Sequence, residues 1–265
     1  MNAIKETTCR MDNGLILNYA RTGHGTHNVI CLPGALGTWQ TDFKPTLAGL
    51  NPDLFTVIGW DPPGYGKSDP LPNRFDANMF KRDARHANAL MEALELVPYS
   101  ILGWSDGANT AVHMAHQQEH DKNVIKMVLW GGNSYVDEKD VAIYEGIRNI
   151  DKWSTKMRQP MIDTYGEERF REMWNAWVDC FVQTFFIDKK GNLYKEVLPE
   201  IKVPTLIVHG TKDVVVPQAH PDYLHANIKG SKLITMEAGH NLHMRYADEF
   251  NKIVTDFLTG EASRL

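Results

Sequence analysis

The sequence has little cysteine and no long run of apolar residues. Its three cysteines, Cys9, Cys31 and Cys180, form neither an even set for disulfides nor a CxxC pair typical of metal sites. This pattern favours a reducing compartment. No stretch of about 18 apolar residues occurs, and the first residues lack the apolar core of a secretory signal. We therefore expect a soluble, cytoplasmic protein.

An excess of positive charge is also missing. The chain has 28 lysines and arginines against 33 aspartates and glutamates, which gives a formal net charge of −5. Neither a nucleic acid nor an anionic membrane is expected as a partner, because both need positive charge on the protein. A small neutral or cationic molecule is the better expectation. The sequence leaves the oligomeric state open.

The apolar residues that are present fall into short runs separated by helical patterns. A content of 43% hydrophobic residues in 265 residues is enough for one large core. Helical spacing occurs over 75–95 and 107–118. This alternation predicts an α/β fold with a mostly parallel sheet covered on both faces. The runs predicted to form buried strands are 28–33, 54–61, 99–104, 124–131, 203–210 and 231–236.

The strand pattern disappears between residues 134 and 200, where a helical stretch rich in large aromatics follows. We expect this stretch to be a helical cap inserted into a core formed by residues 1–133 and 201–265. Most of the aromatics should pack the cap onto the core, and a few could line a substrate cavity. They are Trp153, Trp174, Trp177, Phe181, Phe185 and Phe186.

The strongest local motif is Gly103-Trp104-Ser105-Asp106-Gly107, which lies between a predicted strand and a predicted helix. A G-x-S-x-G sequence in this context forms a nucleophile elbow, a sharp turn that exposes the serine hydroxyl above the sheet. A serine between glycines is often only part of a turn, so the strand and helix on either side carry the prediction. Ser105 is the candidate nucleophile.

A serine nucleophile needs a base to take its proton and an acid to orient that base. Asp213 follows the strand 203–210, and His240 follows the strand 231–236. Both therefore lie in loops at the carboxyl ends of strands, in the chain order expected for this kind of hydrolase. His243 is the main rival to His240. The other late histidines are His209, predicted at a strand end, and His220 and His225, predicted in a helix.

His240 and His243 also have the spacing of two metal ligands, but no carboxylate or cysteine follows at a suitable distance in the sequence. No metal or other cofactor is expected. Acyl transfer also needs two N–H donors for the oxyanion. The Asp106 amide is the first candidate, Ala35 in the glycine-containing turn 32–37 is the second, and Leu36 is next. Leu36 and Asp106 are also the candidate substrate contacts.

Five segments of the chain resemble the α/β-hydrolase superfamily, and more closely its valacyclovir hydrolase family. The resemblance implies hydrolysis of α-amino acid esters by Ser105, Asp213 and His240, with Asp106 holding the substrate's amino group. One departure is Ala108, where the family usually has glycine, which affects only fine details of substrate fit. The segments are GWSDG (103–107), WDPPGYG (60–66), IYEGIR (143–148), LIVHGTKD (206–213) and GHNLHMRYADEFNK (239–252).

Asp106 also points to a cationic substrate on physical grounds. In the first turn of a helix its carboxylate gains only about 0.3 to 1 kcal/mol from the helix dipole. A second negative charge about 4 Å away, such as the oxyanion, costs roughly 4 kcal/mol at an effective dielectric constant near 20. An ammonium group on the substrate would offset that cost. We therefore expect a small ester with an α-amino group.

Three other functions remain open from the sequence. A meta-cleavage carbon-carbon hydrolase uses the same three residues, but its carboxylate-bearing substrate would need an arginine such as Arg148 or Arg158. An aminopeptidase-like amidase is not separated from an esterase. A small-molecule receptor with an unused triad is the third.

Overall fold

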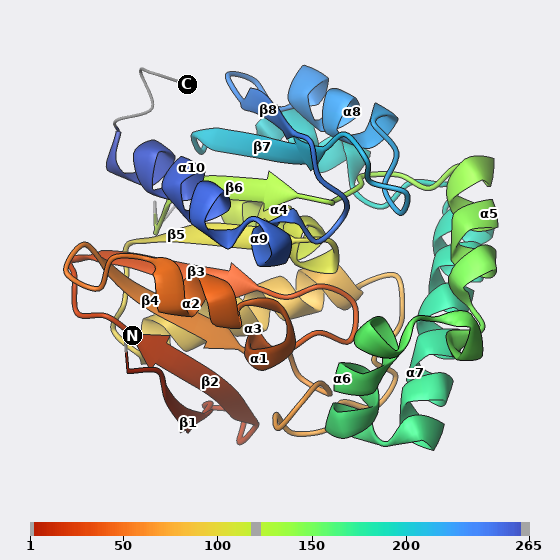
Figure 1. The fold of residues 1–265 in the computed structure, drawn as a ribbon, viewed down its shortest axis with the longest axis horizontal. Helices are drawn as coiled ribbons and strands as arrows, with labels where there is room; N and C mark the ends of the chain where they lie inside the picture. Colours follow the sequence, from red (N-terminus) through yellow and green to blue (C-terminus); the bar gives the residue numbers. More distant parts are fainter. Residues whose placement is uncertain (1–2, 118–122, 261–265) are drawn as a thin grey trace.

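The computed structural model describes residues 3–117 and 123–260, and its centre is one eight-stranded sheet (Figure 1). The strand order is β1-β2-β4-β3-β5-β6-β7-β8. β2 pairs antiparallel with β1 and β4, and all other neighbours are parallel. The strands are β1 (Lys5–Arg10), β2 (Ile16–Thr22), β3 (His27–Leu32), β4 (Phe55–Trp60), β5 (Tyr99–Trp104), β6 (Val124–Trp130), β7 (Thr205–Gly210) and β8 (Lys232–Met236).

Helices cover both faces of this sheet, and each face has its own apolar cluster. On one face lie α1 (Trp39–Asp42), α2 (Lys44–Gly49), α9 (Leu242–Arg245) and α10 (Ala247–Thr259), whose apolar residues share one core cluster. The other face carries α3 (Met79–Ala93), α4 (Asp106–Gln117) and α8 (Ala219–Asn227). Along β3, Val29 and Cys31 join the first cluster while Ile30 and Leu32 join the second, as the two-residue period of a strand requires.

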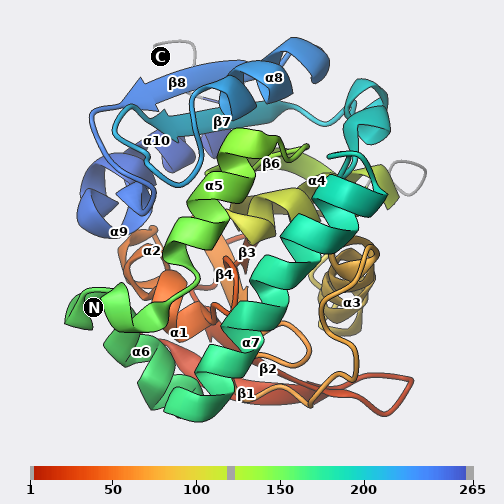
Figure 2. The same ribbon diagram turned by 90° about the vertical axis from the view of Figure 1, so that its right-hand side faces the viewer.

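The region between β6 and β7 is helical and lies across the carboxyl ends of the parallel strands. Figure 2 shows α5 and α7 crossing in front of that edge of the sheet. Trp153, Trp174, Trp177 and Phe181 form a chain of ring contacts, with centroids 4.8, 4.7 and 4.4 Å apart. The elements are α5 (Glu138–Ile147), η1 (Ile150–Lys152), α6 (Thr155–Tyr165), α7 (Glu167–Asp179), the π-helix η2 (Cys180–Asp188) and the 3₁₀ helix η3 (Lys195–Glu200).

The predicted fold class is confirmed, and each of the six expected strands is present to within two residues of its predicted ends. The sequence reading missed β1 and β2. Their side chains are mostly exposed or alternate between buried and exposed, so they lack the continuous apolar run of a buried strand. A usable signal was Asn13-Gly14 in the hairpin turn, where Gly14 has φ of +84°.

Several expectations touch residues that the structure does not describe. Gln118, the last residue of the helix expected at 107–118, lies outside the described residues, as do the ends 1–2 and 261–265 of the expected core. Within the described part, Cys31 is fully buried and all three cysteines are free. None of the described helices combines the length and apolar composition needed to cross a membrane. The boundaries of a separate cap at 134–200 stay a prediction.

Candidate active site

Ser105 occupies the sharp turn between β5 and α4. Its φ of +55° lies in the left-handed region, which a residue with a side chain adopts at an energetic cost. Its N–H donates to the Trp130 carbonyl at the end of β6, at 2.9 Å. A Cβ on Gly107 would lie 2.0 Å from the Leu32 carbonyl oxygen, so only glycine lets α4 start this close to β3. The strained turn is therefore held by contacts on both sides.

Asp213 and His240 meet at the ends of β7 and β8. His240 Nδ1 lies 2.8 Å from Asp213 Oδ2. A carboxylate can only accept, so Nδ1 carries the proton and Nε2 presents a lone pair. Asp213 Oδ1 accepts from the Val215 and Val216 N–H groups at 2.8 and 2.9 Å. Burial raises the pKa of Asp213, but these donors outweigh it and hold the pKa below its ordinary value.

His240 lies beside the serine turn rather than away from it. Its carbonyl accepts from Trp104 Nε1 at 3.0 Å, and the two rings are 5.3 Å apart. A Cβ on Gly131, next to Trp130, would lie 2.7 Å from His240 Cε1. Within the described chain no hydrogen bond joins the Ser105 hydroxyl to His240. Such bonds are often long in ligand-free enzymes and tighten when substrate binds.

His243 has a different environment from His240. It is fully buried, its Nδ1 accepts from Trp130 Nε1 at 3.0 Å, and its Nε2 donates to the Asp42 carbonyl at 2.9 Å. Burial lowers its pKa to about 3, so the ring stays neutral. Both ring nitrogens of His243 therefore form hydrogen bonds within the core. The remaining late histidines are also placed as the sequence suggested, with His209 at the end of β7 and His220 and His225 in α8.

The turn after β3 carries the candidate oxyanion donors. The Gly34 N–H donates to Asp42 Oδ2 at 2.9 Å, and Gly37 N–H returns to the Gly34 carbonyl at 3.0 Å. Leu36, with φ of +57°, lies between them. Among the described residues no acceptor is bound by the N–H groups of Ala35 or Asp106, whereas the Leu36 N–H faces the Tyr65 hydroxyl. The Ala35 and Asp106 groups are therefore available to a ligand.

Asp42 anchors this turn and was missed from the sequence. Its carboxylate lies where a Cβ on Gly37 would clash, 1.8 Å from Oδ2. Burial raises the pKa of Asp42 to about 7, against the hydrogen bonds from Thr41 and Gly34. Its role depends on how the turn folds around it, and no local motif marks it. The glycines at 34 and 37 were the available hint.

Asp106 is buried beside the nucleophile, with 8% of the residue exposed. Trp177 Nε1 of α7 donates to its Oδ2 at 2.7 Å. No other described residue donates to this carboxylate. Burial raises the pKa of Asp106 to about 7, and the Trp177 bond and Arg74 lower it only partly. A cation that reached Oδ1 would find a carboxylate with little other stabilisation.

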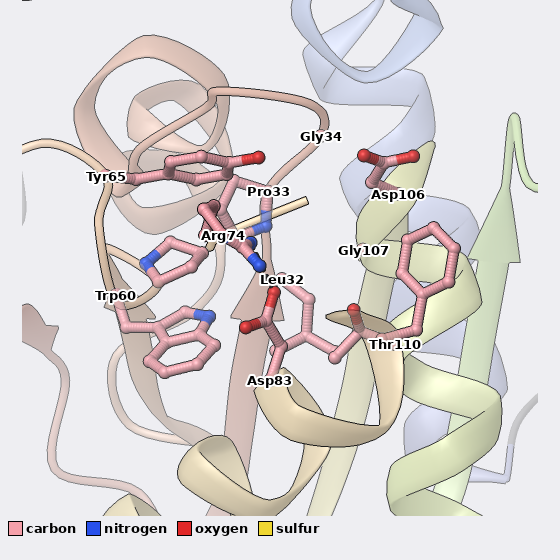
Figure 3. A pocket seen from close by; sticks show the side chains of 12 residues that line it. Leu32, Pro33, Gly34, Trp60, Tyr65, Arg74, Asp83, Asp106, Gly107 and Thr110 are labelled. Atoms are coloured by element: carbon pink, nitrogen blue, oxygen red, sulfur yellow. Dashed lines mark hydrogen bonds and ion pairs between the residues drawn. The ribbon is translucent and has the colours of Figure 1, made fainter. Parts of the chain in front are cut away.

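A small cavity separates Asp106 from a buried ion pair between Arg74 and Asp83 (Figure 3). Sequence reasoning missed this pair and the contact from Trp177. Arg74 follows β4 in a loop and Asp83 lies in α3, so the pair and Asp106 come from separate parts of the chain. The described residues contain no group of three His, Cys, Asp or Glu side chains placed to hold a metal ion.

Comparisons with known proteins identify the family of this chain. Residues 29–253 match the model of the alpha/beta hydrolase family. The chain is 48% identical over 247 residues to "Serine hydrolase BPHL" of Homo sapiens, covering 93% of this chain and 84% of that protein. It is 30% identical to a Pseudomonas putida 2-hydroxy-6-oxononadienedioate/2-hydroxy-6-oxononatrienedioate hydrolase, covering 92% of each.

A solved structure shows the same fold at lower identity. The meta-cleavage product hydrolase from Pseudomonas fluorescens IP01 superposes with a TM-score of 0.78 at 21% identity, covering 96% of this chain and 98% of that one. The resemblance noted from the sequence motifs is thereby confirmed. With the family match over most of the chain and a serine hydrolase at 48% identity, the protein belongs to the alpha/beta hydrolase family and is a serine hydrolase.

Proposed function

We propose that this hydrolase cleaves α-amino acid esters through Ser105, His240 and Asp213. His240 Nε2 takes the proton from the Ser105 hydroxyl as its oxygen attacks the ester carbonyl. The protonated imidazole then gives that proton to the departing alcohol, which leaves an acyl-enzyme on Ser105. Water, activated by the same nitrogen, releases the amino acid and restores the serine. Asp213 keeps the imidazole in the required tautomer throughout, which its 2.8 Å contact with Nδ1 supports.

The oxyanion formed in each step needs N–H donors that are already in place. The Asp106 N–H and that of Ala35 are proposed for this role, since neither has another acceptor among the described residues, and the Leu36 N–H is the alternative to that of Ala35. Asp42 keeps the turn in position by accepting from Gly34. Removing one oxyanion donor typically costs about 10²- to 10³-fold in rate.

The observation that carries the amino-ester proposal is the environment of the Asp106 carboxylate. It is next to the nucleophile, almost fully buried and bound by a single side-chain donor within the described part of the chain. Burial raises the pKa of Asp106 to about 7, because the protein alone stabilises its charged form poorly. A cation that binds beside the carboxylate would supply the missing stabilisation. The α-amino group of an aminoacyl ester lies a few bonds from the attacked carbonyl and would supply this cation.

Carbon-carbon hydrolysis of a carboxylate-bearing substrate is the competing function, since some relatives are named for a dioate substrate. Asp106 would repel a carboxylate near Ser105. The two cap arginines considered for this role are paired elsewhere, Arg148 with Glu145 and Asp179, and Arg158 with Asp151. These contacts favour the ester proposal. Amides that carry the same amino group are a second substrate type under this proposal.

Two matched substrates test the proposal directly. L-valine benzyl ester and 3-methylbutanoic acid benzyl ester differ only in the ammonium group. We expect Asp106→Asn to lower kcat/KM on the valine ester by about 10²-fold or more, since one partner of a buried charge pair is lost. The loss on the other ester should stay within about threefold, because it makes no ionic contact.

Labelling by a fluorophosphonate probe tests the nucleophile separately. The folded wild-type protein should form an adduct at residue 105, and Ser105→Ala should form none. Equal losses on both esters in Asp106→Asn would refute amine recognition. Failure to label the wild-type protein would refute the serine mechanism. A carbon-carbon substrate that outcompetes both esters would favour the competing function.

A further inference from the structure

The cavity beside Asp106 contains a charged residue pair that the proposed reaction does not use. Arg74 Nη2 contacts Asp83 Oδ2, and their side chains are only 8% and 6% exposed. The Arg74 guanidinium lies 4.3 Å from the centre of the Tyr65 ring. Figure 3 shows it between Tyr65 and Asp83, with Asp106 on the other side of the cavity. Burying such a pair is costly unless each charged atom finds a partner.

The hydrogen bonding of this pair is incomplete on the described residues. Arg74 Nε and Nη1 and Asp83 Oδ1 are all buried without a partner. The cavity between them offers about 10 Å³ to the centre of a water molecule, which is room for about one water. Three N–H groups of a guanidinium that always carries its charge, one on Nε and two on Nη1, therefore remain free to bind a carboxylate.

The charges around the cavity are unequal in number. Of the described residues that line it, only Arg74, Asp83 and Asp106 are charged. One guanidinium thus faces two carboxylates. Burial opposes the charge on Arg74, but Asp83 outweighs it and raises the pKa of the guanidinium above its ordinary value. Burial likewise raises the pKa of Asp83, and Arg74 opposes that rise. The paired state leaves one carboxylate, Asp106, without a fixed cation.

We propose that Asp83 makes the site selective for a positively charged substrate. It pairs with Arg74, so that Asp106 is left to bind the ammonium group of the substrate. Asp83 is a positioning residue in this account, since it acts through Arg74 and Asp106. The inference rests on the proposed function. Without Asp83, Asp106 is the remaining carboxylate among the described residues that line the cavity with Arg74. Arg74 would then neutralise Asp106, and its free N–H groups would exclude a cationic substrate.

A purely structural role for the ion pair makes a different prediction. If Arg74 and Asp83 only hold the loop after β4 against α3, losing Asp83 should affect both esters alike. The neighbouring pair Arg82 and Asp76 offers a matched control. It joins the same loop to the same helix at 2.7 Å, but neither residue lines the cavity. Asp76→Asn therefore changes a contact between the same loop and helix, at a side chain that is 41% exposed, and leaves the residues that line the cavity unchanged.

The experiment compares wild type, Asp83→Asn, Asp76→Asn and the double variant Arg74→Gln/Asp83→Asn on the two benzyl esters. We expect Asp83→Asn to raise KM for the valine ester at least tenfold. For the uncharged ester, kcat and KM should each change less than threefold. The double variant should return KM for the valine ester to within threefold of wild type, because the competing cation is gone. Asp76→Asn should leave the ratio of the KM values for the two esters unchanged.

Equal effects of Asp83→Asn on both esters, or no rescue in the double variant, would overturn the inference. Circular dichroism and thermal unfolding show whether each variant folds. If Asp83→Asn does not fold, Arg74→Gln decides, since it removes the cation alone: KM for the valine ester should stay level or fall, and a tenfold rise overturns the inference.

The proposed function can fail separately from this inference. If Asp106→Asn affects both esters equally, the amine contact itself is wrong and the inference falls with it. If Asp106→Asn separates the two esters but Asp83→Asn does not, only the role of Asp83 is wrong.

Discussion

Asp213 and Asp106 are buried carboxylates at the same edge of the sheet, Asp213 in a loop and Asp106 in the first turn of α4, yet their surroundings differ. The Asp213 side chain is 2% exposed and accepts from His240, Val215 and Val216. Among the residues that the structure describes, Asp106 accepts from Trp177 alone. Burial pushes both pKa values up, but the pKa of Asp213 ends below its ordinary value and that of Asp106 rises to about 7. Asp213 has more donors than Asp106 and an imidazole directly beside it, and these offset the effect of burial on its pKa.

This difference suits two separate tasks. A carboxylate that is charged before substrate arrives can hold an imidazole in one tautomer. A carboxylate with a raised pKa and an oxygen to which no described residue donates gains most from a cation that the substrate brings. Changing either aspartate, its hydrogen-bond donors or the pH tests this difference between Asp213 and Asp106.

The largest effect should come from Asp213→Asn. An asparagine amide can donate to Nδ1, which would leave the proton on the wrong nitrogen of His240. We expect kcat to fall about 10⁴-fold on the valine ester and on the uncharged ester alike, measured under substrate saturation. A loss confined to the valine ester would place Asp213 in amine binding and contradict the distinction between the two acids.

The next effect concerns stability and pH. Asp106 has a folded pKa of about 7 against an ordinary value of 3.8, so folding takes up a proton between these values. Its contribution to stability is present at low pH and is lost as pH rises through 7. Asp106→Asn should therefore gain stability relative to wild type between pH 5 and pH 8, on the order of 2 kcal/mol.

Urea unfolding at the two pH values measures this gain. Asp42, whose pKa is also raised to about 7, is present in both proteins and cancels in the comparison. Asp12→Asn, at an exposed position of the β1–β2 turn, is the control and should show no such gain. If Asp106→Asn instead loses stability relative to wild type between these pH values, Asp106 is stabilised in its charged form without substrate.

The smallest effect should come from Trp177→Phe, which removes the single donor to Asp106 and retains a ring. The pKa of Asp106 should rise further, so KM for the valine ester should increase about tenfold at pH 6.5 and less at pH 8.5. Trp174→Phe is a matched control, because Trp174 stacks on Trp177 at 4.7 Å but donates to the Ile147 carbonyl. Equal effects of both variants would assign Trp177 a packing role only.

Much of the fold was predictable because its central strands are continuous apolar runs. β5 was predicted at its observed bounds, and the strands on either side of it within two residues. β1 and β2 escaped because an exposed antiparallel hairpin buries too little to show such a run. The positions of Ser105, Asp213 and His240 after strands were also readable, and their joint role stays a proposal.

The sequence by itself determined the serine turn and the loops that hold Asp213 and His240, because each depends on the strand directly before it. Only the tertiary structure decided the electrostatics around Ser105. Trp177 reaches Asp106 across 71 positions of the chain, and Arg74 and Asp83 approach from a loop and a helix that precede it. A pKa depends on burial and on donors from distant segments, so no local pattern around Asp106 could have revealed it.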